Sequence, residues 1–333
     1  MMVFLKNIVK RVLPHSLYEK IKKLFFYFRR NDILPIKVRL EACTICQLRC
    51  KACSFQNSNC PSLGRGYLKF SDFKKFIQKN KFIRKIELSN YGEIFLNPDL
   101  LKIIEYASVN NIALNAMNGV NFNSVTDEVL EALVKYRFRA IRVSIDGASQ
   151  EIYSQYRING NFDTVISNIR KLNNYKLKYH SEFPKLIWQF ILMEHNENDV
   201  IMAKKMAEEL KMKIDFKLTW VKGYIPKNTD MLRKETGIKY LSREEYVKND
   251  ERNSFIYKLC HSLWDEPQIN WDGRLLGCCC TRSDFGINVF RVGFKKALNS
   301  KNYIYAKKLI QGKIDSPKTK KIYLVLIVVI IYT

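Results

Sequence analysis

Four cysteines stand close together in the segment CTICQLRCKAC, at Cys43, Cys46, Cys50 and Cys53. Thiolates are soft ligands that select zinc or iron–sulfur clusters. Four of them can close a zinc site, whereas three can hold one cluster and leave an iron open for a substrate or cofactor. A four-cysteine zinc site usually joins two CxxC pairs across a longer loop, and here only three residues separate the pairs. The spacing therefore favours a cluster and leaves zinc as the alternative.

A second group of cysteines lies late in the chain, in the segment CHSLWDEPQINWDGRLLGCCC, which begins at Cys260. Gly273 suits a tight hairpin turn between Cys260 and Cys278. The nine cysteines thus form two groups, five early and four late. An extracellular disulfide scaffold would be shorter and more evenly crosslinked, so the two groups indicate metal ligands in an intracellular protein.

The elements that must position these cysteines are predicted from hydrophobic periodicity. Short runs rich in branched apolar residues alternate with amphipathic segments over residues 34–222. We predict strands at 36–41, 85–89, 112–117, 140–146, 186–193 and 214–220. We predict helices at 72–79 with Ser71 as N-cap, after Asn97 and Pro98, and at 126–136, 162–173 and 198–210. Such alternation predicts an α/β fold with a parallel sheet, either open or curled into a partial barrel.

In a parallel sheet of this kind, the reactive groups lie at the carboxyl ends of the strands. Polar or glycine-containing segments stand at five of the predicted strand ends: the first cysteine group, SNYGE at 89–93, NAMNG at 115–119, SIDG at 144–147 and MEHN at 193–196. We therefore expect these segments to converge on one site.

Taken in order, these motifs resemble those of the radical S-adenosylmethionine (radical SAM) superfamily, whose signature is CxxxCxxC after the first strand of a partial (β/α)6 barrel. The resemblance implies that Cys46, Cys50 and Cys53 bind a 4Fe–4S cluster whose fourth iron chelates SAM. Cys43 is then left out, because a fourth thiolate would cap the iron that SAM must occupy. In this family, reductive cleavage of SAM gives methionine and a 5′-deoxyadenosyl radical, which abstracts hydrogen from a substrate. The expected protein is an oxidoreductase-type enzyme of unknown substrate.

Further motifs extend the resemblance over about residues 36–310. Gly92 and Glu93 match a GGE-type motif that holds the methionyl amino group of SAM in the family. The segment MNG at 117–119 resembles a third-strand motif, which makes Asn118 a candidate for cofactor binding. In one branch of the family, a Ser, an Asp and a following Arg approach the ribose and carboxylate of SAM. The matching positions here are Ser144, Asp146 and Arg157.

The late cysteine group resembles the opening of the SPASM/twitch module, which binds auxiliary iron–sulfur clusters. The resemblance implies one auxiliary cluster held by Cys260, Cys278 and Cys279. Relatives carry further cysteines downstream, but none follows Cys280 here. The chain ends instead in SPKTKKIYLVLIVVIIYT, as expected of a truncated or frameshifted end. Two alternatives therefore remain: the module binds an incomplete auxiliary cluster, or it binds none.

The predicted organisation has five parts. They are a basic amphipathic extension at 1–33, the radical SAM core at 34–222, a linker at 223–259, the SPASM/twitch-like module at 260–318 and an atypical apolar tail at 319–333. The extension has no unbroken apolar run, so it is not a signal peptide. It is expected to be a helix that either lies at an anionic membrane surface or docks on the body of the protein. The expected location is the cytoplasm, with peripheral membrane contact as the alternative.

The net charge of +25, from 57 basic and 32 acidic residues, favours anionic partners. The basic residues are spread along the chain, so composition bias explains the charge equally well and no specific nucleic acid is expected. The family resemblance implies a flavodoxin or ferredoxin as reductant and a sugar, peptide or other small-molecule substrate. The segment before the core is too short for a separate peptide-binding domain, which favours a carbohydrate or small molecule. There are two alternatives. The protein could be a peptide-modifying maturase, or an inactive truncated homologue that only binds the cluster.

Overall fold

A computed structural model describes residues 27–51, 53, 55, 63–219, 225–249, 261–277 and 284–314. The predicted auxiliary ligands Cys260, Cys278 and Cys279 lie outside the described residues, as do residues 1–26 of the extension and the apolar tail. Within the described part, the chain folds as the predicted α/β protein.

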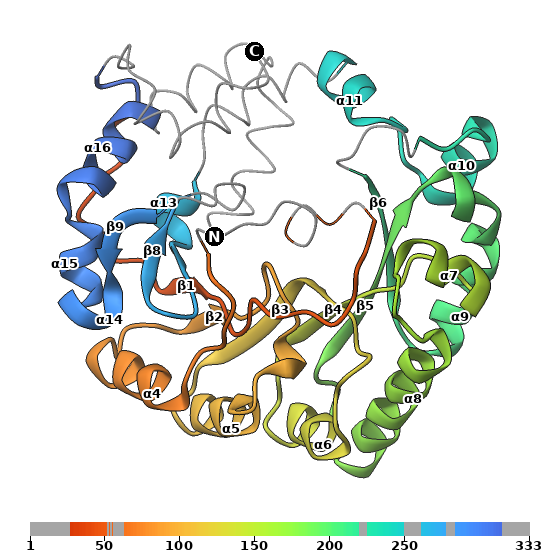
Figure 1. Ribbon diagram of the computed structural model, residues 1–333, viewed down its shortest axis with the longest axis horizontal. Helices are drawn as coiled ribbons and strands as arrows, with labels where there is room; N and C mark the ends of the chain where they lie inside the picture. Colours follow the sequence, from red (N-terminus) through yellow and green to blue (C-terminus); the bar gives the residue numbers. More distant parts are fainter. Residues whose placement is uncertain are drawn as a thin grey trace.

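A single sheet of nine strands, in the order β6-β5-β4-β3-β2-β1-β7-β8-β9, curves through the molecule (Figure 1). Neighbouring strands from β1 to β6 are parallel. Their bounds are β1 Lys37–Leu40, β2 Lys85–Glu87, β3 Ala113–Val120, β4 Ala140–Ser144, β5 Lys185–Leu192 and β6 Lys213–Leu218. All six predicted strands are thus confirmed to within a few residues, and together they form a partial barrel.

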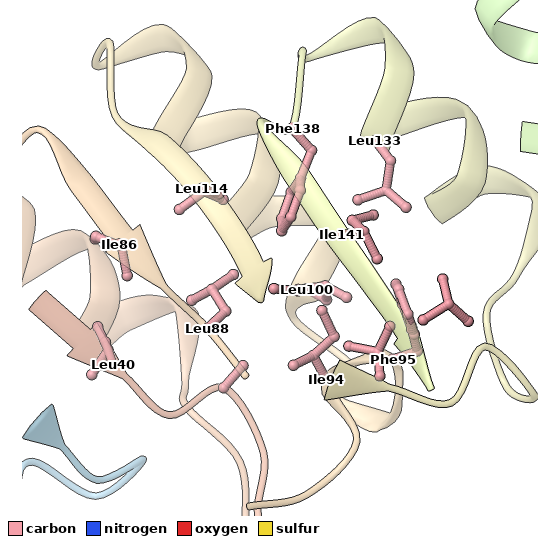
Figure 2. Packing of buried hydrophobic residues seen from close by; sticks show 14 of the residues in the cluster. Leu40, Ile86, Leu88, Ile94, Phe95, Leu100, Leu114, Leu133, Phe138 and Ile141 are labelled. Atoms are coloured by element: carbon pink, nitrogen blue, oxygen red, sulfur yellow. The ribbon is translucent and has the colours of Figure 1, made fainter. Parts of the chain in front are cut away.

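The helices cover the outer face of the curved sheet (Figure 1). The main ones are α4 Phe70–Lys79, α5 Leu100–Val109, α6 Asp127–Lys135, α8 Phe162–Lys178 and α9 Val200–Glu209. Alternate strand residues point toward them because side chains in a strand alternate between its two faces. Leu40, Ile86, Leu114 and Ile141 therefore pack in the buried core between sheet and helices (Figure 2).

Two predicted helix starts are wrong. Helix α4 begins at Phe70 rather than after Ser71, and the Phe70 N–H donates to Asp99 Oδ2 at 2.9 Å. Helix α5 has Asp99 rather than Asn97 as its N-cap. The Asn97 amide instead donates to the carbonyl oxygens of Ala42 and Leu68 at 2.9 and 3.0 Å. Tertiary contacts thus replaced the local caps that the residue types suggested.

The connections between these elements contain shorter helices near the carboxyl ends of the strands. They are η1 Ile94–Leu96, α7 Gln150–Tyr156 and η2 Glu194–Asp199. The region predicted as a linker contains α10 Thr229–Thr236 and α11 Arg243–Asn249. None of the helices in the described ranges is both long and apolar enough to cross a membrane.

The C-terminal part extends the same sheet. The hairpin of β7 Gln268–Ile269 and β8 Arg274–Leu276 turns at Gly273 as predicted, and β7 pairs in parallel with β1. Gly273 has φ +90°, and a Cβ there would lie 2.5 Å from the ring of Phe290. Strand β9 Asp284–Asn288 and the helices α13 Ser262–Asp265, α14 Val289–Val292, α15 Phe294–Leu298 and α16 Lys301–Ile310 complete this part.

The described end of the N-terminal extension docks on these helices. The indole N–H of Trp264 in α13 donates to Asn31 Oδ1 at 2.8 Å. The amide of Gln311, which follows α16, donates to the Arg29 carbonyl at 2.9 Å. Residues 27–32 thus follow the docked alternative, which ties the two ends of the described chain together.

Candidate functional site

A cavity of about 370 Å³ lies at the carboxyl ends of the parallel strands. Every predicted cluster and SAM residue except Asp146 lines it: Cys46, Cys50, Cys53, Gly92, Glu93, Asn118, Ser144 and Arg157. These residues come from the connections after β1, β2 and β4 and from strands β3 and β4 themselves. Four of the five segments predicted to converge thus contribute to the cavity, whereas no residue of the segment MEHN at 193–196 lines it.

The loop that carries the three cavity cysteines is anchored by backbone hydrogen bonds. The N–H of Cys53 donates to the Cys50 carbonyl, and the N–H of Arg49 donates to the Ile158 carbonyl, both at 3.0 Å. Burial raises the pKa of the Cys46 thiol to about 12 and also raises that of Cys50. The thiolate forms therefore need a nearby positive charge, which bound iron supplies.

The zinc alternative would need ligands that are gathered around a single ion. Within the described ranges, no three His, Cys, Asp or Glu side chains come close enough to hold one metal ion. The three cavity cysteines instead line a shared space. A 4Fe–4S cluster fits such a donor set, because three of its four irons would each bind a separate soft thiolate and the fourth would stay open.

Cys43 does not belong to this set. Its side chain is fully buried, and its sulfur contacts the backbone of Ile45 at 3.4 Å to the N–H and 3.6 Å to the carbonyl. Cys43 also pairs with Tyr67 in an isolated β-bridge. Its thiol is thus used in packing, away from the cavity lining.

Gly92 allows two backbone segments to touch. A Cβ at this position would lie 2.3 Å from the Cys43 carbonyl oxygen and 2.7 Å from that of Ile45. The buried carboxylate of Glu41 accepts from the N–H groups of Tyr91 and Gly92 at 3.2 and 3.4 Å. The loop after β2 is thereby held against the start of the cysteine loop.

Glu93 is buried beside this glycine at the start of η1. Its carboxylate accepts from the N–H of Phe95 at 3.3 Å and from the N–H of Asn121 at 2.5 Å. Burial raises its pKa to about 7. A buried carboxylate of this kind gains from a bound cation such as an ammonium group.

Arg157 and Asp146 form a buried ion pair. The Nε and Nη2 atoms of Arg157 both lie 2.6 Å from Asp146 Oδ2, and Asp146 Oδ1 accepts from the Ile191 N–H at 2.7 Å. Arg157 lines the cavity, and its Nη1 lies 3.5 Å from Cys50 Sγ. Asp146 is fully buried and does not line the cavity, but both residues that it binds, Arg157 and Ile191, do.

Ser144 and Asn118 also line the cavity. Ser144 Oγ accepts from Gln189 Nε2 at 3.1 Å, and Gln189 Oε1 accepts from Lys217 Nζ at 2.7 Å. The side-chain amide of Asn118 donates to the Ser89 carbonyl at 2.7 Å. These contacts fix the side chains that the cavity presents.

Three residues of the site were missed by sequence reasoning: Glu41, Asn121 and Gln189. Only Gln189 carried a visible signal, as the one polar residue in the run LIWQFILM. Such a residue in a strand covered on both faces has a polar partner or a ligand. Glu41 and Asn121 carry no comparable local signal.

The concave face of the sheet is strongly polar. Gln268, Arg39, Glu87 and Asn115 are direct neighbours across β7, β1, β2 and β3. Their chain neighbours Val38, Ile86, Leu114 and Ile269 belong to the apolar core, so this row points away from the helices. Within the part of the chain that the structure describes, both amide atoms of Gln268 and the amide nitrogen of Asn115 are buried without a hydrogen-bond partner.

Comparisons with known proteins agree with this geometry. The family model for the radical SAM superfamily matches residues 40–206. The chain is 26% identical over 178 residues to the AdoMet-dependent heme synthase of Methanosarcina barkeri, covering 53% of this chain and 48% of the relative. It is 25% identical over 154 residues to the mycofactocin maturase MftC of Mycobacterium tuberculosis, covering 46% and 38%. The matches thus span about half the length of these relatives or less.

The fold is similar to that of SuiB from Streptococcus suis, with a TM-score of 0.62 at 13% identity over 98% of this chain and 82% of SuiB. SuiB has also been solved bound to S-adenosylmethionine and to the precursor peptide SuiA. At this identity the likeness concerns the fold alone.

Proposed function

Because this chain belongs to the radical SAM superfamily, we propose that Cys46, Cys50 and Cys53 hold its 4Fe–4S cluster and that the enzyme abstracts a hydrogen atom from a polar small molecule. Members of this family are enzymes whose cofactors are a 4Fe–4S cluster and SAM. When bound, these cofactors supply a 5′-deoxyadenosyl radical and methionine from SAM and one electron. A flavodoxin or ferredoxin would deliver that electron.

The observation that carries the proposal is the shared cavity lining. We infer that Glu93 receives the amino group of SAM, because its buried carboxyl group gains from a bound cation. The positive charge of Arg157 would attract the carboxylate of SAM, and the Ser144 hydroxyl would hydrogen-bond to a hydroxyl group.

The polar concave face supports a hydroxyl- or amine-rich substrate such as a carbohydrate. An unpartnered buried amide costs about 1–3 kcal/mol. Gln268 and Asn115 present such groups in one row with Arg39 and Glu87. A polar ligand that reached this row, which lies outside the cavity lining, could donate to the Gln268 oxygen and accept from the side-chain amide N–H groups of Gln268 and Asn115.

A peptide substrate is the second candidate. It is favoured by the fold similarity to SuiB, solved with a precursor peptide, and by the sequence similarity to the maturase MftC. Amide side chains such as Gln268 and Asn115 also pair well with a peptide backbone. The two candidates are separated by whether carbohydrates or precursor peptides stimulate 5′-deoxyadenosine formation.

The decisive experiment is anaerobic reconstitution with iron and sulfide, followed by incubation with SAM and dithionite. We expect about four irons per cluster site and formation of 5′-deoxyadenosine. Cys46→Ala should lose both, whereas Cys43→Ala, which alters a thiol outside the cavity, should keep both. A full cluster and intact SAM cleavage in Cys46→Ala would contradict the proposal. A cluster without SAM cleavage in the parent protein would favour the inactive homologue.

A further inference from the structure

Two side chains direct N–H groups at sulfurs of the cavity cysteines. Arg157 Nη1 lies 3.5 Å from Cys50 Sγ, and Asn121 Nδ2 lies 3.8 Å from Cys46 Sγ. The two donors come from different parts of the barrel, Arg157 from the end of α7 and Asn121 from just after β3. One donor is a cation and the other is neutral.

The position of Arg157 is determined by its buried partner. Asp146 has no exposed surface, and one of its oxygens takes both Nε and Nη2 of Arg157 at 2.6 Å. Its other oxygen is held by the Ile191 N–H in β5. A guanidinium bound through two nitrogens has a fixed plane, so its remaining nitrogen is directed at Cys50.

The amide of Asn121 is equally fixed. Its Oδ1 accepts from the backbone N–H of Asn123 at 2.9 Å and from Gln47 Nε2 at 3.0 Å. A backbone N–H can only donate, so the oxygen must face that side. The Nδ2 group then faces the other way, where it lies 3.3 Å from Gln47 Oε1 and 3.8 Å from Cys46 Sγ. Gln47 is itself held by Ser124 Oγ at 2.7 Å.

We propose that Arg157 and Asn121 raise the reduction potential of the cluster held by Cys46, Cys50 and Cys53, with Asp146 acting as the positioning residue for Arg157. The inference rests on the proposed function. Hydrogen bonds to ligating sulfurs, and positive charge beside them, stabilise the form with one more electron. The one-electron reduction of the cluster thereby becomes easier for a biological reductant.

The two donors contribute unequally. Arg157 adds a positive charge in a buried setting, where electrostatic interactions are screened least, although its partner Asp146 offsets part of that charge. Asn121 adds only a dipole, at the longer distance. The larger effect on the potential therefore belongs to Arg157.

The test is the midpoint potential of the reconstituted cluster, measured by redox titration with electron paramagnetic resonance. For Arg157→Gln we expect the reduced-to-oxidised ratio at a fixed ambient potential to fall about tenfold, or about 59 mV for a one-electron couple. For Asn121→Leu we expect a smaller fall, and for Arg157→Lys partial retention of the parent potential. An Arg157→Gln potential equal to that of the parent would overturn the proposal.

Arg142 offers a matched control. It is also a barrel arginine in an ion pair, with its Nη2 2.8 Å from Asp215 Oδ2, and its Nη1 donates to the Met117 carbonyl. Arg142→Gln should leave the potential unchanged, and a fall as large as that of Arg157→Gln would show a nonspecific charge effect and contradict the proposal.

A second variant covers the case in which Arg157→Gln leaves Asp146 unpaired and prevents folding. In Asp146→Asn/Arg157→Gln both charges are removed, and the potential should still fall because the donor next to Cys50 is lost. Parent-like potential in this variant would also overturn the proposal. Failure of the proposed function is distinct, because it would show as a parent protein that assembles no 4Fe–4S cluster at all.

Discussion

At the scale of single residues, Gly92 shows how one missing side chain allows the site to form. The carbonyl oxygens of Cys43 and Ile45 occupy the space that a Cβ would need. Backbone atoms cannot move aside as the end of a flexible side chain can. The glycine in this motif therefore serves close packing of two loops, whatever further contact it makes with a cofactor.

We predict that Gly92→Ala lowers the free energy of unfolding by about 3 kcal/mol and reduces cluster content, because the loop after β2 must shift away from the cysteine loop. Gly237→Ala is the control, since Gly237 has φ +68° but no atom lies within 4 Å of the position that its Cβ would take. That change should cost only about 1 kcal/mol from backbone strain. Thermal unfolding and iron analysis measure both, and equal losses in the two variants would contradict the packing role.

Glu41 is the second residue whose burial has a measurable consequence. Desolvation raises its pKa to about 8, although it accepts from the N–H groups of Tyr91 and Gly92. The folded state therefore prefers the protonated form. The corresponding stabilisation is complete below about pH 4.5 and is lost as the pH rises to about 8.

We predict that Glu41→Gln is more stable than the parent at pH 8 and loses this advantage near pH 5. One pKa unit corresponds to about 1.4 kcal/mol, so the difference between the two pH values should be several kcal/mol at most. Denaturant unfolding of both proteins at the two pH values measures it. A stability difference that is independent of pH would show that Glu41 does not titrate in this range.

At the scale of elements, the β7–β8 hairpin supports the segment that follows the cysteine loop. The indole N–H of Trp271 donates to the Leu63 carbonyl at 3.1 Å, and its ring leaves no room for a Cβ on Gly66. The Thr44 hydroxyl donates to the Gly64 carbonyl at 3.0 Å. The hairpin thus braces the beginning of the cysteine loop from the opposite end of the chain.

We predict that Trp271→Ala lowers the free energy of unfolding by about 2 kcal/mol and speeds loss of the cluster to a chelator, because the brace on the cysteine loop is removed. Trp264→Ala is the matched control, since Trp264 is a buried tryptophan of α13 that contacts Asn31 instead. Trp264→Ala should lower the free energy of unfolding at least as much as Trp271→Ala does. When the two variants are compared at the same folded fraction, Trp264→Ala should not lose its cluster faster than the parent. Equal rates of cluster loss would contradict the bracing role.

At the scale of the whole molecule, the net charge of +25 affects how the enzyme meets its reductant. A strongly positive protein attracts acidic partners at long range, and salt screens this attraction over about 10 Å at 0.1 M ionic strength. The charge is spread over the chain. The attraction should therefore raise the rate at which reductant and enzyme meet more than it strengthens any single contact between them.

We predict that 5′-deoxyadenosine formation driven by an acidic flavodoxin slows severalfold between low and high salt, because electrostatic steering is screened. The same reaction driven by reduced methyl viologen, a cation, should not slow. Equal salt dependence with the two reductants would show that salt acts on the enzyme rather than on the encounter.

Much of the fold and part of the site could be predicted from local patterns. Hydrophobic periodicity marked the six parallel strands, because burial on the helix-covered face is repeated along each strand. The resemblance of the cysteine spacing to the radical SAM signature indicated Cys46, Cys50 and Cys53 as the cluster ligands. The helix starts at Ser71 and Asn97 were wrong because distant groups, Asp99 and the carbonyls of Ala42 and Leu68, decide the hydrogen bonding there.

The sequence by itself determined which residues have the chemistry for a cluster and at which strand ends they stand, since ligand type, spacing and periodicity are local properties. Only the tertiary structure decided that Asp146 pairs with Arg157, that Asn121 contacts both Glu93 and Cys46, and that β7 pairs with β1. Each of these contacts joins segments that are distant along the chain. Their geometry follows from strand register and packing in three dimensions, which no short stretch of sequence encodes.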